Sequence, residues 1–379
     1  MNRRPYIDFY RKHAISPVAR EINWDIHFIQ RKALYNRLGI LPCNVRGRKV
    51  LEFGPGNSVN SLYTISMEPD HYVLVDGNPT GIENSRENLT RFHPEKNWEI
   101  VDSLIEEYDT DEKFDLVICE GLIPNQVNPT QMARHCASFV GEGGIFVVTS
   151  HDMISTVSET LRCLSGWLLT RNIYDFDEQV RVLAKLFENH LEHLKGMNRT
   201  KEEWVTDNIL HTEFWQDAPL FSIEEAISAL DQDFIVHATS PWFLQDWRWY
   251  KSVENVKTHF NDVMKESYWQ NTHNFIDWRI ISLPREKSDN LTLYETCKAI
   301  RDKVREAANA DESIVKVIDK CRKLATLLPE EYTDTKVAID SYVRGMTSYI
   351  KTGEIHPDMF RDFGAWWGRG MQYVSFVRK

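Results

Sequence analysis

A glycine-rich connection early in the chain limits the folds open to it. The stretch GRKVLEFGPGNSVNSL, residues 47–62, is a short apolar run that ends in Gly54-Pro55-Gly56 and turns at once into a helical segment. Glycine at such a point lets another group approach the backbone more closely than a Cβ atom would allow. A loop between a strand and the start of a helix also commonly binds a nucleotide-like ligand. The sequence therefore predicts a small-molecule site at the end of the first strand.

Short apolar runs alternate with helical segments through the first 150 residues. We expect five strands there, followed by two later ones that return to the same sheet, at 49–53, 71–77, 98–103, 114–121, 143–150, 233–241 and 370–379. This alternation predicts an α/β fold with a doubly wound, mostly parallel seven-stranded sheet and a large helical addition. Right-handed crossovers then place the carboxyl ends of the parallel strands at one edge, where ligands bind.

The helical segments divide the chain into regions. We expect an N-terminal helical cap over 1–46, an α/β core over 47–250 with a helical insertion at about 151–221, a helical region covering the substrate over 251–360, and a last strand within 361–379. Within the cap, residues 17–39 predict one helix. Its apolar positions Ile22, Ile26, Ile29 and Leu34 recur at helical intervals, and Gly39 ends it.

Charge is distributed unevenly along the chain. The formal net charge is −11, yet residues 1–50 hold eleven Lys/Arg against three Asp/Glu. We interpret the basic residues as the solvated face of N-terminal helices that pairs with acidic neighbours, and the alternative is a basic arm that steers an anionic substrate. The residues of this face are Arg3, Arg4, Arg11, Lys12, Arg31 and Lys32. The acidic remainder argues against a nucleic-acid partner.

The composition also bears on the compartment. No apolar run reaches the roughly 18 residues of a membrane span, and the N-terminus lacks the apolar middle of a signal peptide. The six cysteines are scattered, as expected for reduced thiols. We therefore expect a cytoplasmic protein, with no membrane contact, that acts on a small molecule and forms a homodimer.

The residues after the first strand narrow the choice of ligand. A dinucleotide-binding loop has a small residue three positions after the second glycine, but Val59 stands there. The Gly-Lys-Ser/Thr of a phosphate-binding Walker loop is absent. A ligand with an adenosine and an amino-acid tail but no phosphate needs the close backbone approach and less of the helix N-terminus. The loop is consistent with such a ligand.

Acidic or small residues follow the next strands in order. Asp76 ends the second strand, Asp102 the third, and Glu120 with Gly121 the fourth. A carboxylate at the end of the second strand can accept hydrogen bonds from both ribose hydroxyls. Without a ligand, Asp76 would cap the following turn, Glu120 would pair with a lysine, and the glycines would make a tight connection.

This ordered series over residues 47–150 resembles the class I S-adenosylmethionine-dependent methyltransferases. The resemblance implies S-adenosylmethionine as the cofactor. By this resemblance, the methionine end of the cofactor would contact Glu52, Gly54, Pro55 and Gly56. The ribose would contact Asp76, Gly77 and Asn78, and the adenine would contact Asp102 and Ser103. Glu120 and Gly121 would line the floor of the cleft. The chain departs from the family in having Asn57-Ser58 after Gly56, without the usual third glycine.

The sequence gives weaker indications of the residues that would contact the molecule receiving the methyl group. His151 and Asp152 follow the fifth strand on the ligand edge, and we predict them as catalytic, with His151 as the base. The alternative for His151 is a local hydrogen bond at the start of a helix. His190 and His193 lie one helical turn apart, but no third ligand is evident, so we expect no metal site. The aromatic clusters in 241–250, 267–278 and 363–370 fit packing of the helical block better than a substrate platform.

The expected function is therefore methyl transfer to nitrogen or oxygen of a small or medium-sized metabolite. Two alternatives remain open. One is an aminocarboxypropyl or aminopropyl transferase that uses the same cofactor and fold. The other is a non-catalytic module that binds the cofactor or a protein partner.

Overall fold

Seven strands form one sheet in the computed structural model, which describes residues 5–15, 22–94, 97–124, 126–194, 199–211, 219–243, 246–251, 259–307 and 310–379. The strand order is β3-β2-β1-β4-β5-β7-β6, and β7 runs antiparallel to both of its neighbours. The predicted doubly wound, mostly parallel sheet is confirmed. The strands are β1 Lys49–Phe53, β2 His71–Asp76, β3 Trp98–Asp102, β4 Phe114–Cys119, β5 Val140–His151, β6 Phe234–Ser240 and β7 Met371–Arg378.

The strand registers bring the predicted ligand residues to one edge. Phe53 of β1 pairs with Val75 of β2 on one side and with Cys119 of β4 on the other. Asp76 pairs with Asp102 across β2 and β3. The glycine loop and the residues after β2, β3 and β4 therefore start from the same carboxyl edge, as the crossover rule requires.

Alternate residues of the strands enter two separate cores. On one face, Val50, Tyr72 and Leu74 pack with the helices that follow β1 and precede it. On the other face, Leu51 and Val73 belong to a larger core that continues into the C-terminal helices. This two-sided burial explains why the strands read as nearly continuous apolar runs.

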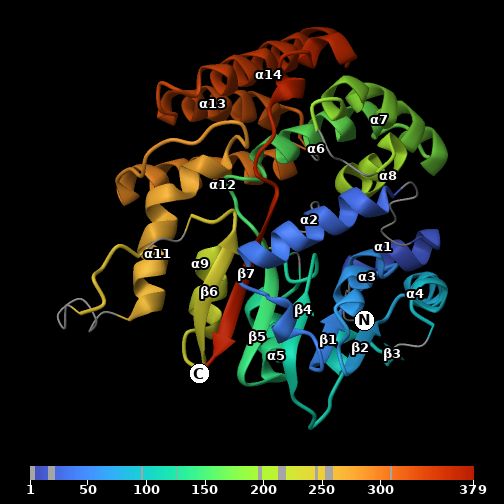
Figure 1. Ribbon diagram of the computed structural model, residues 1–379. Coiled ribbons are helices and arrows are strands. Elements are labelled where there is room, and N and C mark those ends of the chain that lie inside the picture. The colour runs from blue at the N-terminus through green and yellow to red at the C-terminus, as the bar shows by residue number, and fades with distance from the viewer. Residues whose placement is uncertain are drawn as a thin grey trace.

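Helices cover both faces and the carboxyl edge of the sheet (Figure 1). Polar caps set several of their starts: Asn78 before Pro79, Asn128 before Pro129, and Ser222, the predicted cap, which forms a capping box with Glu225. The helices of the first 240 residues are α1 Pro5–His13, α2 Trp24–Arg37, η1 Pro42–Asn44, α3 Val59–Ser66, α4 Pro79–Phe92, η2 Ile105–Glu107, α5 Pro129–Ser138, α6 Val157–Thr170, α7 Phe176–Leu191, α8 Lys201–Val205, the π-helix η3 Thr206–Leu210 and α9 Ile223–Leu230.

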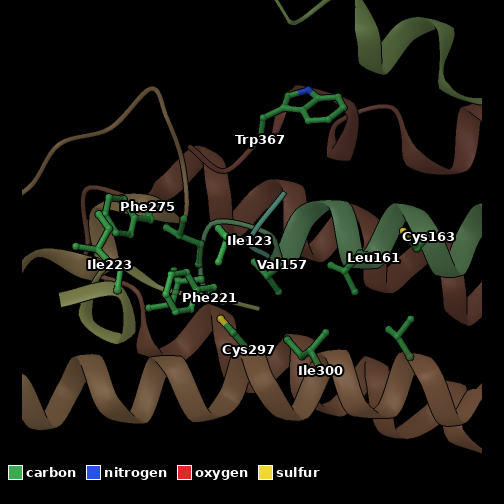
Figure 2. Close-up of a cluster of buried hydrophobic side chains, with 14 of the residues drawn as sticks. Ile123, Val157, Leu161, Cys163, Phe221, Ile223, Phe275, Cys297, Ile300 and Trp367 are labelled. Carbon is green, nitrogen blue, oxygen red and sulfur yellow. The ribbon is translucent and has the colours of Figure 1, made fainter. Parts of the chain in front are cut away.

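The second half of the chain forms a helical block above the carboxyl edge, at the top of Figure 1. Val157 and Leu161 of α6 face Cys297 and Ile300 of α12, and these side chains belong to the same core as the sheet (Figure 2). The block therefore shares its core with the sheet. Its helices are α11 Phe260–Asn271, η5 Thr272–Phe275, α12 Lys287–Ala307, α13 Glu312–Leu327, α14 Thr333–Thr352, η6 Pro357–Phe360 and η7 Phe363–Ala365. None of the helices in the described ranges is long and apolar enough to cross a membrane.

A buried arginine fastens the segment that leads into β7. Arg162 of α6 is fully buried, and its guanidinium donates to the carbonyl oxygen of Trp366 at 2.8 Å. It also lies 3.5 Å from the ring centroid of Trp367. Trp366 and Trp367 are themselves buried, so the aromatic cluster in 363–370 packs the block, as predicted. In 241–250, by contrast, Trp242, Trp249 and Tyr250 are exposed.

The buried face of α2 differs from the prediction. The helix is confirmed over Trp24–Arg37, although the first part of the predicted 17–39 segment, residues 17–21, lies outside the described residues. Ile26 and Ile29, predicted to face the core, are 49% and 67% exposed. The buried face instead carries His27, Arg31 and Tyr35, one turn apart. This face is polar because it packs beside the carboxyl edge, where buried polar partners meet it.

Candidate active site

The glycine loop adopts backbone conformations that L-residues with side chains rarely take. Gly54 and Gly56 have φ angles of +64° and +61°. A Cβ atom on Gly54 would lie 2.1 Å from Cδ1 of Leu122, which follows Gly121 after β4. Close approach and positive φ thus both require glycine here, as the sequence predicts.

Helix α4 supports the loop from behind. The Ser58 hydroxyl donates to the Ser85 hydroxyl at 2.6 Å, which in turn donates to the carbonyl oxygen of Gly56 at 2.8 Å. Asn88 donates its side-chain amide to the carbonyl oxygen of Asn57 at 2.8 Å. Ser58 itself has a φ of +60°. The departure from the family's third glycine therefore coincides with a hydroxyl relay between the loop and α4, which sequence reasoning missed.

Asp76 joins the second strand to the loop. Its Oδ2 accepts a hydrogen bond from the backbone N–H of Gly56 at 3.1 Å, and its Oδ1 accepts from that of Asn78 at 2.8 Å. The carboxylate thus caps the following turn, as the ligand-free alternative expected. The backbone N–H of Gly77 also interacts with this carboxylate, which offers about four acceptor positions in all. Burial raises the pKa of Asp76 to about 6, with the Asp102 charge adding to the effect.

The expected adenine side of the edge is more open. Asp102 is exposed beside Asp76, and half-buried Ser103 donates its hydroxyl to the carbonyl oxygen of Leu104 at 3.0 Å. A Cβ atom on Gly77 would contact the side chains of Leu104 and Ile7, at 2.8 and 3.1 Å. Gly77 is thus packed closely under α1.

Helix α1 spans from this edge to the helical insertion, between α4 and α8 at the right of Figure 1. Arg11 donates to the carbonyl oxygen of Gly77 at 2.5 Å, and Asn78 donates to that of Ile15 at 3.1 Å. On its other side, the ring of His13 stacks on Phe176 of α7 with centroids 4.1 Å apart. The N-terminal cap therefore contacts both the residues after β2 and the insertion.

Glu52 occupies a different environment from the glycines that follow it. Its carboxylate lies on the sheet face covered by α2 and α3, where it accepts a hydrogen bond from the hydroxyl of Tyr72. Burial raises its pKa to about 7, and the Glu120 charge adds to the shift. Glu52 is only 3% exposed, so it contributes to the buried polar contacts beside the loop, together with Tyr72.

Glu120 and Gly121 lie at the end of β4, next to the glycine loop. Glu120 forms a bidentate ion pair with Arg31 of α2, with nitrogen–oxygen distances of 3.0 and 2.8 Å. The partner of Glu120 is thus an arginine from the N-terminal cap and not the expected lysine. No pattern in the sequence predicts this pairing. Gly121 has a φ of +73°, donates its N–H to the Thr149 hydroxyl at 2.7 Å, and leaves open space where a Cβ atom would stand.

His151 and Asp152 separate at the end of β5. His151 is half-buried, and its pKa is lowered to about 4 by burial and then by the Arg301 charge. Asp152 is fully buried; it accepts hydrogen bonds from the hydroxyl of Tyr268 and from the backbone N–H of Ile154. Burial raises the pKa of Asp152 to about 6. These contacts anchor α11 to the sheet, so Asp152 fits a structural role better than a catalytic one.

The other histidine pair has a structural setting. His190 is buried, and its Nδ1 accepts a hydrogen bond from Nε of Arg162 at 3.3 Å. In the described part of the chain, no group of three His, Cys, Asp or Glu residues is placed to hold a metal ion.

Residues 44–214 match a family model described as a methyltransferase domain. This match covers the glycine loop, the acidic strand ends and β5. Residues 44–214 therefore form a methyltransferase domain.

Solved structures similar to this methyltransferase share little sequence with it. A candidate methyltransferase from Thermoplasma acidophilum is 21% identical at a TM-score of 0.26, over 31% of this chain and about half, 49%, of its own. The N-methyltransferase NodS from Bradyrhizobium japonicum in complex with S-adenosylhomocysteine is 11% identical at 0.34, over 58% and 80%. PKMT2 from Rickettsia typhi in complex with AdoHcy is 15% identical at 0.39, over 64% and 50%. No curated protein matches the chain in sequence. These similarities add nothing to the functional assignment.

Proposed function

We propose that this methyltransferase transfers the methyl group of S-adenosylmethionine to a nitrogen or oxygen atom of a small or medium-sized metabolite. The observation that carries the proposal is the contact between Asp76 and the backbone of Gly56 at the carboxyl edge. It places a carboxylate that suits ribose hydroxyls beside a loop with no Cβ atoms at Gly54 and Gly56. The family match over 44–214 supports the same cofactor.

The proposed cofactor contacts follow the edge in order. Gly54, Pro55 and Gly56 would hold the amino-acid tail, and Asp76 with Gly77 and Asn78 the ribose. Asp102 and Ser103 would meet the adenine, and Glu120 and Gly121 the cleft floor. S-adenosylmethionine supplies an electrophilic methyl group when it is bound. The protein's task is to align the acceptor lone pair with that methyl, which accounts for much of the rate in such reactions.

His151 is the candidate base of the proposed reaction. Its lowered pKa keeps the imidazole neutral near pH 7, the state that a base requires, while a pKa of about 4 makes it a weak base unless the bound acceptor raises that pKa. Its position at the carboxyl end of β5 places it two strands from the glycine loop. Asp152 would act on His151 only indirectly, by fixing the turn after β5 through Ile154 and Tyr268.

The position of the helical block favours a small molecule as the methyl acceptor. The block stands over the carboxyl edge and shares its core with the sheet, so it is the part of the chain placed to cover an acceptor bound at that edge (Figure 1). Exclusion of water strengthens the electrostatic interactions within such a site. We therefore propose residues 251–360 as the region that determines the acceptor.

Product analysis tests the proposal. The purified protein is incubated with S-adenosylmethionine and fractionated cell metabolites, and the nucleoside products are measured by mass spectrometry. Methyl transfer predicts S-adenosylhomocysteine together with a metabolite heavier by one methylene unit. Accumulation of methylthioadenosine would indicate aminocarboxypropyl transfer from S-adenosylmethionine, or aminopropyl transfer from its decarboxylated form, and contradict the proposal. Tight cofactor binding without any turnover across the fractions would favour the non-catalytic module.

A further inference from the structure

The ion pair between Arg31 and Glu120 is unusual in being almost completely buried at the edge of the candidate site. The two side chains are 7% and 9% exposed. Burial alone would lower the pKa of Arg31, but the Glu120 carboxylate outweighs that effect and raises it, so the guanidinium stays charged. The loss of hydration on burying two charges offsets much of the attraction between them. Apolar residues in place of such a pair often stabilise a fold equally well. Stability alone therefore gives a poor reason for the pair.

Three elements around the glycine loop meet at the Glu120 carboxylate. Arg31 comes from α2, Glu120 follows β4, and Asn60 lies in α3, directly after the loop. The Asn60 amide donates to Oε2 of Glu120 at 3.0 Å, the same oxygen that accepts from Nη1 of Arg31. Because Cys119 pairs with Phe53, Glu120 stands beside Gly54. The carboxylate is thus fixed from two sides next to the start of the loop.

The guanidinium is held in turn by the buried face of α2. It lies 5.1 Å from the ring centroid of Tyr35, one turn further along the helix. The Tyr35 hydroxyl is hydrogen-bonded to Thr64 of α3 at 2.5 Å. The position of Arg31 is therefore set by packing that does not involve the carboxylate, as a preorganised group requires.

Counting acceptors leaves one position on Glu120 for a ligand. A carboxylate has about four, and the donors in the described residues take three of them: two on Oε2 and one on Oε1. Among the described residues, Oε1 therefore retains one acceptor position, on a residue whose backbone lies next to that of Gly54. A fixed carboxylate with one open position suits a cation, and an ammonium group is the cation that an amino-acid tail brings to this loop.

We propose that Arg31 is a positioning residue, which with Asn60 holds Glu120 as a fixed anion for the ammonium group of the cofactor tail. The inference rests on the proposed function, since it takes S-adenosylmethionine as the ligand. It explains why the buried face of α2 is polar and why the N-terminal cap contacts β4. Arg31 acts through Glu120 and does not itself touch the ligand.

A swap of the ion pair for apolar residues separates this role from a role in folding. In the double variant Arg31→Met/Glu120→Leu, no charge is left unpaired, so the fold is expected to persist. Calorimetry then compares S-adenosylmethionine and S-adenosylhomocysteine, which carry the tail, with 5′-methylthioadenosine, which lacks the ammonium. We expect about 10- to 100-fold weaker binding of the first two and unchanged binding of the third. Arg37→Met, on the exposed side of the same helix, is the matched control and should bind all three as the wild type does.

The outcomes are distinguishable. A folded double variant that keeps its affinity for S-adenosylmethionine, or that loses all three ligands equally, overturns the inference. If the double variant does not fold, Arg31→Lys, which keeps the charge but loses the bidentate geometry, decides by the same ratio of affinities. Failure of the wild type to bind any of the three compounds would instead contradict the proposed function.

Discussion

Glu52 illustrates how burial beside the site affects single residues. Its pKa is raised from 4.5 to about 7 by burial, while the unfolded chain keeps the ordinary value. Between these pH values the native protein holds a proton that the unfolded chain has lost, so rising pH favours unfolding. The contribution of Glu52 to stability is therefore greatest below about pH 4.5 and declines until about pH 7.

The corresponding prediction concerns Glu52→Gln, whose amide oxygen can still accept from Tyr72. As pH rises from 4.5 to 8, the variant should gain on the order of 2–3 kcal/mol in free energy of unfolding relative to the wild type. Urea titrations at a series of pH values measure this difference. Glu83→Gln, on the exposed face of α4, should show no such pH-dependent gain. A constant difference between Glu52→Gln and the wild type at all pH values would contradict the assigned pKa.

At the residue scale, sequence reasoning found the backbone features better than the side-chain partners. Positive φ at Gly54 and Gly56 follows from the local pattern alone. The Arg31–Glu120 pair spans 89 positions in the sequence, and a single sequence carries no signal that joins the two. The one available clue was the arginine in α2 at the same helical face as Tyr35, which the apolar pattern of Ile26 and Ile29 obscured.

Helix α1 gives a prediction at the scale of an element. Its contact with α7 depends on Phe176, whose ring meets His13 and Phe9 with centroid distances of 4.1 and 6.4 Å. Phe176→Ala should therefore increase amide hydrogen exchange of residues 5–15 by about 5- to 30-fold, corresponding to roughly 1–2 kcal/mol of local opening.

The matched control is Tyr174→Ala, two residues earlier, where the side chain is 96% exposed. It should leave the exchange of α1 unchanged. Equal exchange in both variants would show that the Phe176 contact does not hold α1, which also bonds to Gly77 through Arg11 and packs against His211 through Phe9.

Most elements were predictable because their signals are local. Strands read as apolar runs, and caps such as Ser222 with Glu225 mark helix starts. The fifth strand is longer than predicted, Val140–His151 against 143–150, because Val140 pairs with Phe114 across an irregularity in the register. The prediction of the buried face of α2 was wrong because that face is polar, to match the polar site that it covers. Hydrophobic periodicity detects only apolar faces.

The whole molecule is expected to unfold as one unit. Cys119 of β4 and Cys136 of α5 belong to the same core as Cys297 of α12 and Cys321 of α13. A shared core couples the stability of its parts. The regions predicted from sequence, such as 251–360, are therefore expected to be segments of one folding unit and not to unfold independently.

The cysteines allow a direct measurement. In a urea series, thiol labelling followed by peptide mass spectrometry should give one midpoint for all five buried cysteines, which are these four and Cys163. Cys43 is exposed and should be labelled without urea, which controls for reagent activity. Labelling of Cys297 and Cys321 at clearly lower urea than Cys119 and Cys136 would show that the helical block opens separately.

Calorimetric titration of S-adenosylmethionine into the wild type and Asp76→Ala tests the central claim most directly. Loss of the charge-assisted hydrogen bonds to ribose should weaken binding by about 1.5–3 kcal/mol, or roughly 10- to 150-fold. Asp70→Ala, just before the opposite end of the same strand, should bind as the wild type does. Unchanged affinity in a folded Asp76→Ala variant would remove the carboxylate from the site, and a wild type that ignores S-adenosylmethionine would contradict the account as a whole.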